Sequence, residues 1–394
     1  MFLELKNRYL KMPFIENHTR ILRFLFAPFT PVYALAVRIR NMFFDKGLKE
    51  THTFGFPVIC VGNLCVGGSG KTPLTEYLVR MLGRDFAVGI VSRGYGRRSR
   101  GNFLAKEGMN AEMIGDEPVQ YMENFAAGGQ GKAVCPHGFA LYLAARRKEG
   151  VEALRREFPA LQVCILDDAY QHRQVRAGLN ILVSDVAKPF FRDYPLPYGT
   201  LRESRRGSRR AQIVVFGKCP SDWREEDRDA FLSAWKPAPY QHVFFTTVKY
   251  GDFVRIDTDP VPSCGTDHDD SRDKVAQFPH RILLFTGIAN AAPLETHLRR
   301  QGYDIVEHRR FGDHHTYTPQ ETQALAERAR GLAAQGGSPL LLTTQKDYCR
   351  LKDTAAFAYF CHLPVAYIPI RTEFLFGQGE EFDRAVRDFA RGGK

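Results

Sequence analysis

Short apolar runs alternate with longer amphipathic stretches along most of this 394-residue chain. The apolar runs are rich in Val and Ile, and the stretches between them have a helical period. Buried strands separated by helices are typical of a parallel sheet that is covered on both faces. In the first half, the pattern predicts strands over 58–64, 86–92, 132–135, 163–168, 180–185 and 212–218, and helices over 71–83, 116–125 and 138–149.

A second series of the same kind follows. It predicts strands over 242–248, 281–288, 303–308, 339–344 and 366–370, and helices over 291–301 and 318–334. Residues 256–276 are acidic, contain prolines and have no period, so we expect a surface insertion there. The sequence therefore predicts an α/β protein with two α/β/α sandwich domains, over 46–235 and 236–394.

The N-terminal segment, residues 1–45, has a different character. Fourteen uncharged residues lie between Arg23 and Arg38, and further arginines flank them. A membrane-spanning helix needs about 20 apolar residues, and this run also contains Pro28 and Pro31. Two interpretations remain: a helix that lies in the headgroup region of an anionic bilayer, or an ordinary buried helix.

Composition and charge narrow the functional classes. The net charge is +11, and residues 1–100 hold 16 Lys and Arg against 6 Asp and Glu. Such a positive field attracts phosphates, nucleic acid or an anionic bilayer. No nucleic-acid-binding motif is visible, which disfavours nucleic acid as a partner. The eight cysteines contain no C-x-x-C pair, so we expect reduced thiols and no structural zinc.

The strongest local motif is VGNLCVGGSGKTP at 61–73, between a predicted strand and a predicted helix. Glycines let the backbone N–H groups of such a loop converge on phosphate oxygens at a helix N-terminus. The first domain is therefore predicted to resemble a P-loop NTPase, although a cysteine replaces the first glycine of the usual pattern. The predicted nucleotide-binding residues are Cys65, Val66, Gly67, Gly68, Ser69, Gly70, Lys71 and Thr72.

An apolar strand that ends in two carboxylates, VCILDDAYQHR at 163–173, supports a Mg²⁺-nucleotide site. Thr72 with Asp167 or Asp168 would ligate the metal, as in other phosphate-loop enzymes. A guanine-reading N-K-x-D is not visible, so ATP is the expected nucleotide.

Two further polar clusters could supply the group that accepts a proton. Asp116 and Glu117 of GDEP lie at a loop-to-helix junction, where a helix-capping role is the alternative. FGDHHTY at 311–317 offers His314 and His315 beside Asp313, where solvated loop histidines are the alternative. Arginines in SRGYGRR (92–98) and LRESRRGSRR (201–210) could bind the anionic groups of an acceptor. The residues alone also allow a soluble kinase or ligase for a small anionic metabolite, or a regulatory nucleotide-binding ATPase.

Taken together, these motifs resemble one family. VGNLCVGGSGKTP, SRGYG, GDEP, LDDAYQHR, LRE, FTGIAN, F-G-D-H-H-x-Y and TTQKD occur in the order and approximate spacing of the tetraacyldisaccharide 4′-kinases, the lipid A 4′-kinases. The resemblance implies transfer of the ATP γ-phosphoryl group to the 4′-hydroxyl of a tetraacyldisaccharide 1-phosphate, with Mg²⁺. It also implies peripheral binding to the cytoplasmic face of the inner membrane of a Gram-negative bacterium, and no obligate protein partner.

The resemblance assigns roles to individual residues. It implies that Asp116 and His314 form a catalytic dyad, with Glu117 and Lys71 close by. The residues implied to contact the acceptor are Arg93, Gln171, His172, Arg202 and Glu203. It also favours membrane association of the N-terminal segment, because an acceptor with four acyl chains stays in the bilayer. For the fold, the resemblance implies two α/β/α sandwich domains joined by a short linker.

Overall fold

The computed structural model describes residues 26–126, 131–256 and 278–392. The first 25 residues of the predicted N-terminal segment lie outside the described residues, and so does the predicted insertion apart from its first residue.

Within the described residues the larger sheet has nine strands, in the order β14-β8-β7-β6-β1-β5-β2-β4-β3. All neighbouring strands from β8 to β4 run parallel, and only the two edge strands, β14 and β3, are antiparallel. Their bounds are β1 Val58–Gly62, β2 Val88–Ser92, β3 Phe103–Leu104, β4 Phe139–Leu143, β5 Val163–Leu166, β6 Leu179–Asp185, β7 Ile213–Gly217, β8 His242–Tyr250 and β14 Ile370–Phe374.

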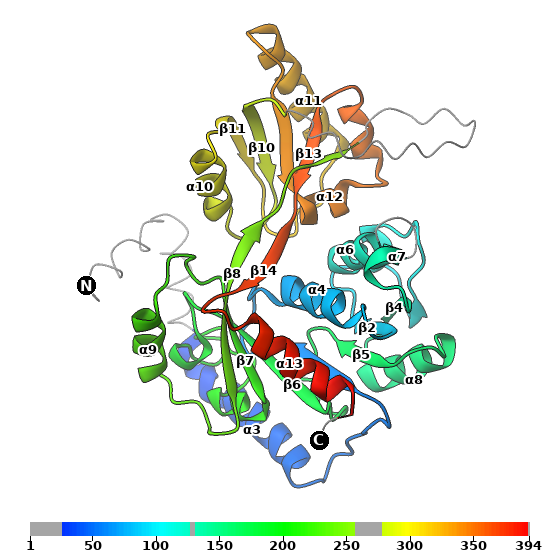
Figure 1. Cartoon of the computed structure of the whole chain (residues 1–394), viewed down its shortest axis with the longest axis vertical. Helices are drawn as coiled ribbons and strands as arrows, with labels where there is room; N and C mark the ends of the chain where they lie inside the picture. The colour runs from blue at the N-terminus through cyan, green and yellow to red at the C-terminus, as the bar shows by residue number, and fades with distance from the viewer. Residues whose placement is uncertain (1–25, 127–130, 257–277, 393–394) are drawn as a thin grey trace.

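The smaller sheet of the described chain has the order β11-β10-β12-β13-β9, parallel except for β9. In Figure 1 it lies above the larger sheet, and β8 and β14 run between the two. Its strands are β9 Val254–Ile256, β10 Arg281–Thr286, β11 Asp304–Arg310, β12 Leu340–Thr344 and β13 Val365–Ile368.

Helices cover both faces of both sheets. Apolar residues of α4, α6 and α13 share one core with the larger sheet, while α8 and α9 belong to the core on its opposite face. On the smaller sheet, α11 covers one face and α10 the other. The predicted α/β class with two α/β/α sandwiches is confirmed. The α-helices are α3 Thr30–Asp45, α4 Lys71–Leu82, α5 Ala111–Ile114, α6 Asp116–Phe125, α7 Gly131–Val134, α8 Arg147–Glu157, α9 Glu225–Ser233, α10 Ala292–Arg300, α11 Pro319–Ala334, α12 Gln345–Leu351 and α13 Gly379–Ala390, and the 3₁₀ helices are Ala27–Phe29, Phe190–Arg192, Arg205–Arg210 and Ala355–Phe360.

One part of the predicted element order is wrong. The strand expected over 132–135 is the short helix α7, and the helix expected over 138–149 is β4 followed by the start of α8. Residues 139–144 form a continuous apolar run, and such a run does not distinguish a buried strand from a helix by its period. The parallel pairing of β4 with β2 decides the outcome.

The segment predicted to form the smaller domain, 236–394, is divided between the two sheets. β8, β14 and α13 pack with the larger sheet, and Phe382 and Val386 of α13 lie in the same core as Leu78 of α4. Fully burying each of these side chains contributes about 1.5–3 kcal/mol. The chain therefore crosses between the sheets twice, once on leaving β8 and once on entering β14 (Figure 1).

Candidate active site

The loops that carry the predicted chemistry meet at the carboxyl ends of the parallel strands. The glycine-rich loop follows β1, Arg93 follows β2, and Asp167 and Asp168 follow β5. In open α/β sheets this edge is where ligands bind. Asp116 and Glu117 begin α6, and His314 lies in the turn between β11 and α11 of the smaller sheet.

The glycine-rich loop has the shape of an anion cradle. Gly67 and Gly70 have φ of 104° and 90°, in the left-handed region that glycine adopts without strain. A Cβ at Gly67, Gly68 or Gly70 would meet no atom within 4 Å, so the loop borders open space. In the described chain, the backbone N–H groups of residues 67–70 have no hydrogen-bond acceptor. These donors fit the phosphate oxygens of a nucleotide.

Side chains behind the loop hold this shape. Asn63 Nδ2 donates to Ser69 Oγ at 2.9 Å, and both residues are buried. On the other side, Lys218 Nζ donates to the carbonyl oxygen of Gly68 and forms an ion pair with Asp185 at 3.0 Å.

Lys71, the first residue of α4, is held beside Asp168. Its Nζ lies 3.3 Å from Asp168 Oδ1, and Arg202 Nη1 donates to both carboxylate oxygens at 3.1 Å. Burial alone would raise the pKa of Asp168, but the charges of Lys71 and Arg202 outweigh it and lower the pKa. Asp168 is therefore an anion that positions two cations at the mouth of the cradle.

Thr72, Glu117 and Asp167 present oxygen atoms next to the cradle. Thr72 Oγ1 donates to Glu117 Oε1 at 2.9 Å, and Asp167 accepts from Ser92 Oγ at 3.1 Å. Burial, and next the negative charges of Glu117 and Asp168, raise the pKa of Asp167. An excess of buried negative charge among oxygen ligands fits a divalent cation.

These residues are suited to a Mg²⁺ ion that is bound together with a nucleotide. The described residues contain no group of three His, Cys, Asp or Glu side chains placed to hold a metal ion. Mg²⁺ commonly takes only one or two protein carboxylates, with phosphate oxygens and water as its other ligands. Such a donor set needs no all-protein cage.

Asp116 is surrounded by side chains from the smaller sheet and its helices. His314 Nδ1 lies 3.1 Å from Asp116 Oδ2, and Arg350 donates to the same oxygen through Nε at 2.9 Å and Nη2 at 2.8 Å. Lys346 Nζ lies 3.6 Å from it. Burial alone would raise the pKa of Asp116, but the hydrogen bond from His314 and the charges of Lys346 and Arg350 hold it well below its usual value.

Two residues of the site have strained backbones. His314 has φ of 58° and Asp168 has φ of 44°. Residues other than glycine adopt such a backbone conformation at a free-energy cost of order 1–3 kcal/mol. The turn of His314 is fixed at Gly287 of FTGIAN, whose carbonyl oxygen accepts from His314 N at 3.2 Å and from Arg350 Nη1 at 2.7 Å. Strain of this kind persists where the surroundings over-determine the conformation.

Gln171, Arg202 and Glu203 join the site to α3. Gln171 Nε2 donates to Glu203 Oε1 at 3.1 Å and to the carbonyl oxygen of Asn63 at 2.9 Å. From α3, Tyr33 OH donates to the carbonyl oxygen of Arg202 at 2.8 Å, and Asn41 Nδ2 donates to Glu203 at 2.9 Å. The N-terminal helix is therefore bonded to residues that adjoin the glycine-rich loop.

Several residues considered in the sequence analysis do not take part in the hydrogen bonds and ion pairs described above. Arg93 is exposed and has no ion pair with any described residue. His172 makes no hydrogen bond through its ring to the described chain, and burial, followed by the charges of Arg147 and Arg93, lowers its pKa to about 4. His315 turns away from Asp116, and its Nε2 pairs with Glu321 at 2.9 Å. Cys65 forms a β-bridge with Leu201, while Val66 is largely exposed.

Arg350 and Lys346 belong to the site, although the sequence did not single them out as site residues. Lys346 occurs within TTQKD, and Arg350 follows it by one helical turn on α12. Residues four apart lie on the same face of a helix. The available signal was therefore the TTQKD motif, whose Lys346 is followed four residues later by Arg350.

Comparison with known proteins bears directly on this arrangement. The family model described as tetraacyldisaccharide-1-P 4′-kinase matches residues 22–391. The chain belongs to this family. It is 36% identical to the tetraacyldisaccharide 4′-kinase of Bacteroides thetaiotaomicron over 95% of each chain, and 35% identical to that of Flavobacterium johnsoniae over 94% of this chain and 98% of the relative.

A solved member of the tetraacyldisaccharide 4′-kinase family has the same fold. It is the crystal structure of LpxK from Aquifex aeolicus in complex with ATP, with a TM-score of 0.65 and 26% identity. The match covers 93% of this chain and 98% of that one. The family resemblance expected from the sequence motifs is thus confirmed.

Proposed function

We propose that this protein is a tetraacyldisaccharide 4′-kinase, which transfers the γ-phosphoryl group of ATP to the 4′-hydroxyl of a tetraacyldisaccharide 1-phosphate. The observation that carries the proposal is the contact between Asp116 and His314. The residue after Asp116 is Glu117, which accepts a hydrogen bond from Thr72 of the glycine-rich loop. A proton-accepting pair beside a phosphate cradle is the arrangement that transfer to an alcohol requires.

The nucleotide end is assigned to the glycine-rich loop. The free N–H groups of residues 67–70 bind phosphate oxygens, and Lys71 adds a positive charge at the start of α4. Asp168 and Arg202 keep Lys71 in place before substrate arrives. Positioning and charge neutralisation account for most of the catalysis in phosphoryl transfer.

Thr72 and Asp167, with Glu117 beside them, would hold Mg²⁺. A metal ion bound there would neutralise charge that develops on the phosphate oxygens. Asp167 is already oriented by Ser92, and Arg147 donates to the carbonyl oxygen of Asp167 at 2.8 Å.

The acceptor proton is assigned to His314. Because the carboxylate of Asp116 can only accept, Nδ1 of His314 carries the proton between them and Nε2 has the lone pair, which faces Lys346 Nζ at 3.4 Å before the acceptor binds. Nε2 takes the proton of the attacking 4′-hydroxyl, and Asp116 stabilises the imidazolium that results. Arg350 and Lys346 keep Asp116 ionised and fix its orientation.

The lipid end of the acceptor is assigned to α3. Val32, Leu35, Ile39 and Met42 follow one another at helical spacing, and all four are exposed, Val32 by 66%. In the described part of the chain, no helix is long and apolar enough to cross a bilayer. An exposed apolar stripe flanked by Arg38 and Arg40 supports peripheral binding to an anionic membrane, on the cytoplasmic face where ATP is available.

A phosphorylation assay tests the proposal. Purified protein, γ-labelled ATP, Mg²⁺ and tetraacyldisaccharide 1-phosphate in neutral detergent micelles should give a labelled lipid with the phosphate at the 4′ position. ATP hydrolysis without transfer of label would contradict it, as would transfer to a water-soluble sugar phosphate at a comparable kcat/KM.

A further inference from the structure

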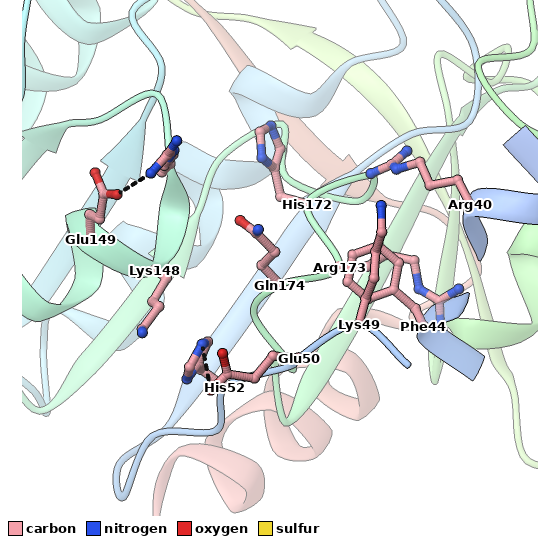
Figure 2. Close-up of a pocket in the computed structure, with 11 residues that line it drawn as sticks. Arg40, Phe44, Lys49, Glu50, His52, Lys148, Glu149, His172, Arg173 and Gln174 are labelled. Atoms are coloured by element: carbon pink, nitrogen blue, oxygen red, sulfur yellow. Dashed lines mark hydrogen bonds and ion pairs between the residues drawn. The ribbon is translucent and has the colours of Figure 1, made fainter. Parts of the chain in front are cut away.

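A basic pocket adjoins the acceptor end of the site. It has a volume of about 540 Å³ and lies between the C-terminal part of α3, the segment after it, the start of α8 and the loop after Asp168 (Figure 2). We call it the α3–α8 pocket. Its lining residues are Arg40, Phe44, Lys49, Glu50, His52, Arg146, Lys148, Glu149, His172, Arg173 and Gln174.

The lining of the α3–α8 pocket is strongly cationic. Five lysine and arginine side chains line it against two glutamates, and two histidines add capacity for positive charge. Each glutamate already has a partner within the lining: Glu149 pairs with Arg146 at 3.0 Å, and Glu50 lies 3.4 Å from His52 (Figure 2).

Two of these cations are left for a ligand. Arg40 donates to the backbone carbonyl oxygen of Gln171, and Lys49 lies over the ring of Phe44 at 5.6 Å. Neither has a carboxylate partner anywhere in the described chain. A guanidinium and an ammonium that face one cavity without a counter-charge are suited to a phosphate dianion.

The α3–α8 pocket continues directly from the catalytic residues. Gln171 bonds to Glu203 and lies 3.5 Å from Arg202, whose guanidinium holds Asp168 beside Lys71. The next residue, His172, already lines the pocket, where burial, followed by the charges of Arg147 and Arg93, lowers its pKa. An elongated acceptor can therefore extend from the phosphate loop, past Gln171, into this cavity.

We infer that the α3–α8 pocket binds the phosphate monoester at the far end of the acceptor, the 1-phosphate of the disaccharide. This inference rests on the proposed function. The 1-phosphate and the 4′-hydroxyl lie at opposite ends of the two linked sugars, so one phosphate anchors the reducing end while the other end is phosphorylated. The exposed apolar stripe runs along α3, the same helix that contributes Arg40 and Phe44 to the pocket, so the acyl chains can leave along this helix toward the bilayer.

The experiment compares two acceptors in neutral detergent micelles that contain no phospholipid. One carries the 1-phosphate, and the other has a free hydroxyl at that position. For Lys49→Ala, which removes one of the two cations without a carboxylate partner, we expect KM for the 1-phosphate acceptor to rise about tenfold or more, because a hydrogen bond to a charged group contributes roughly 1.5–3 kcal/mol. We expect kcat and the KM for ATP to stay within twofold, and the acceptor without phosphate to show no difference between variant and wild type.

Matched outcomes separate this inference from its rivals. Lys106→Ala, an exposed lysine outside the pocket, should match the wild type on both acceptors. Equal losses on both acceptors, or no loss on the phosphorylated one, would overturn the inference. A variant that loses only its binding to phosphatidylglycerol vesicles would also overturn it, by assigning the pocket to bilayer phosphates. Wild-type protein that phosphorylates neither acceptor would overturn the proposed function instead.

Discussion

His314 Nδ1 lies 3.1 Å from Asp116 Oδ2, although 198 residues separate the two along the chain. The aspartate begins a helix of the larger sheet, and the histidine lies in a turn of the smaller one. Their contact is one of those that join the two halves of the molecule, and several consequences can be measured.

Removal of either member of this pair should slow the chemical step. We expect Asp116→Asn and His314→Ala each to lower kcat by about 10²- to 10⁴-fold, the usual contribution of a positioned proton acceptor. The KM for ATP should change little, because neither side chain touches the glycine-rich loop. Steady-state kinetics with His315→Ala as the matched control would check this, and a kcat within twofold of wild type for His314→Ala would assign the proton to another group.

Arg350 should act through the ionisation of Asp116. Loss of its charge raises the pKa of Asp116, so the acidic limb of the pH profile of kcat/KM should move to higher pH in Arg350→Gln. Arg350→Lys should restore part of the shift. The sign for stability agrees: Asp116 has a lowered pKa when folded, so its contribution is present above the unfolded value of 3.8 and is lost as the pH falls through the folded value. An unchanged pH profile in Arg350→Gln would limit this arginine to a structural role.

Neutralising Asp167 and neutralising Asp168 should change the stability of the protein in opposite directions. Asp167 is a buried carboxyl group with a raised pKa, so Asp167→Asn should stabilise the protein without ligand and abolish the extra stabilisation that Mg²⁺ gives to the ATP complex. Asp168→Asn should destabilise it, because Lys71 and Arg202 lose their partner. Thermal unfolding with ATP, with and without Mg²⁺, measures both; a Mg²⁺ effect that survives Asp167→Asn would remove this residue from the metal site.

Glu76 on α4 should make stability depend on pH. It is fully buried and accepts from Gln120 at 2.8 Å and Asn124 at 2.7 Å, and burial raises its pKa from 4.5 to about 7. A raised folded pKa means that this contribution is fully present below pH 4.5 and is lost as the pH rises through about 7. At 1.36 kcal/mol per pKa unit, the loss is about 3 kcal/mol.

Substitution at the same position tests this dependence. Glu76→Gln should be more stable than wild type at pH 8 and differ much less at pH 5, as urea denaturation at the two values would show. Parallel curves for the two proteins across this range would contradict the assignment.

The exposed stripe of α3 should control membrane binding. Val32→Asp combined with Leu35→Asp should abolish sedimentation with anionic vesicles and raise the KM for the lipid acceptor, while ATP binding is retained. Val254→Asp, at an exposed position of β9 in the smaller sheet, is the matched control. Vesicle binding that survives the α3 substitutions would place the membrane contact elsewhere.

The sequence predicted the parts of this protein whose signals are local. The strand, glycine turn and helix around Lys71 are adjacent in the chain, and the strand before Asp167 is a plain apolar run. By contrast, the helix predicted over 138–149 proved to contain a strand, because pairing with β2 is a long-range effect that a short apolar run does not report.

The contacts between distant segments could not be read from the sequence. The family resemblance named Asp116 and His314. The charged side chains around this pair depend on how α12 packs against α6, and only the fold shows that Arg350 donates hydrogen bonds to Asp116. Likewise, the return of α13 to the larger sheet depends on tertiary packing of Phe382, for which the chain has no local marker.

Asp116 and Glu117 are adjacent in the chain and join the two groups to which we assign proton transfer and metal binding. Asp116 is bonded to Arg350 of α12 and to His314, and Glu117 accepts a hydrogen bond from Thr72. A displacement of the first turn of α6 would thus disturb proton transfer and metal coordination together. The first turn of α6 therefore couples the position of the smaller sheet to the geometry of the glycine-rich loop.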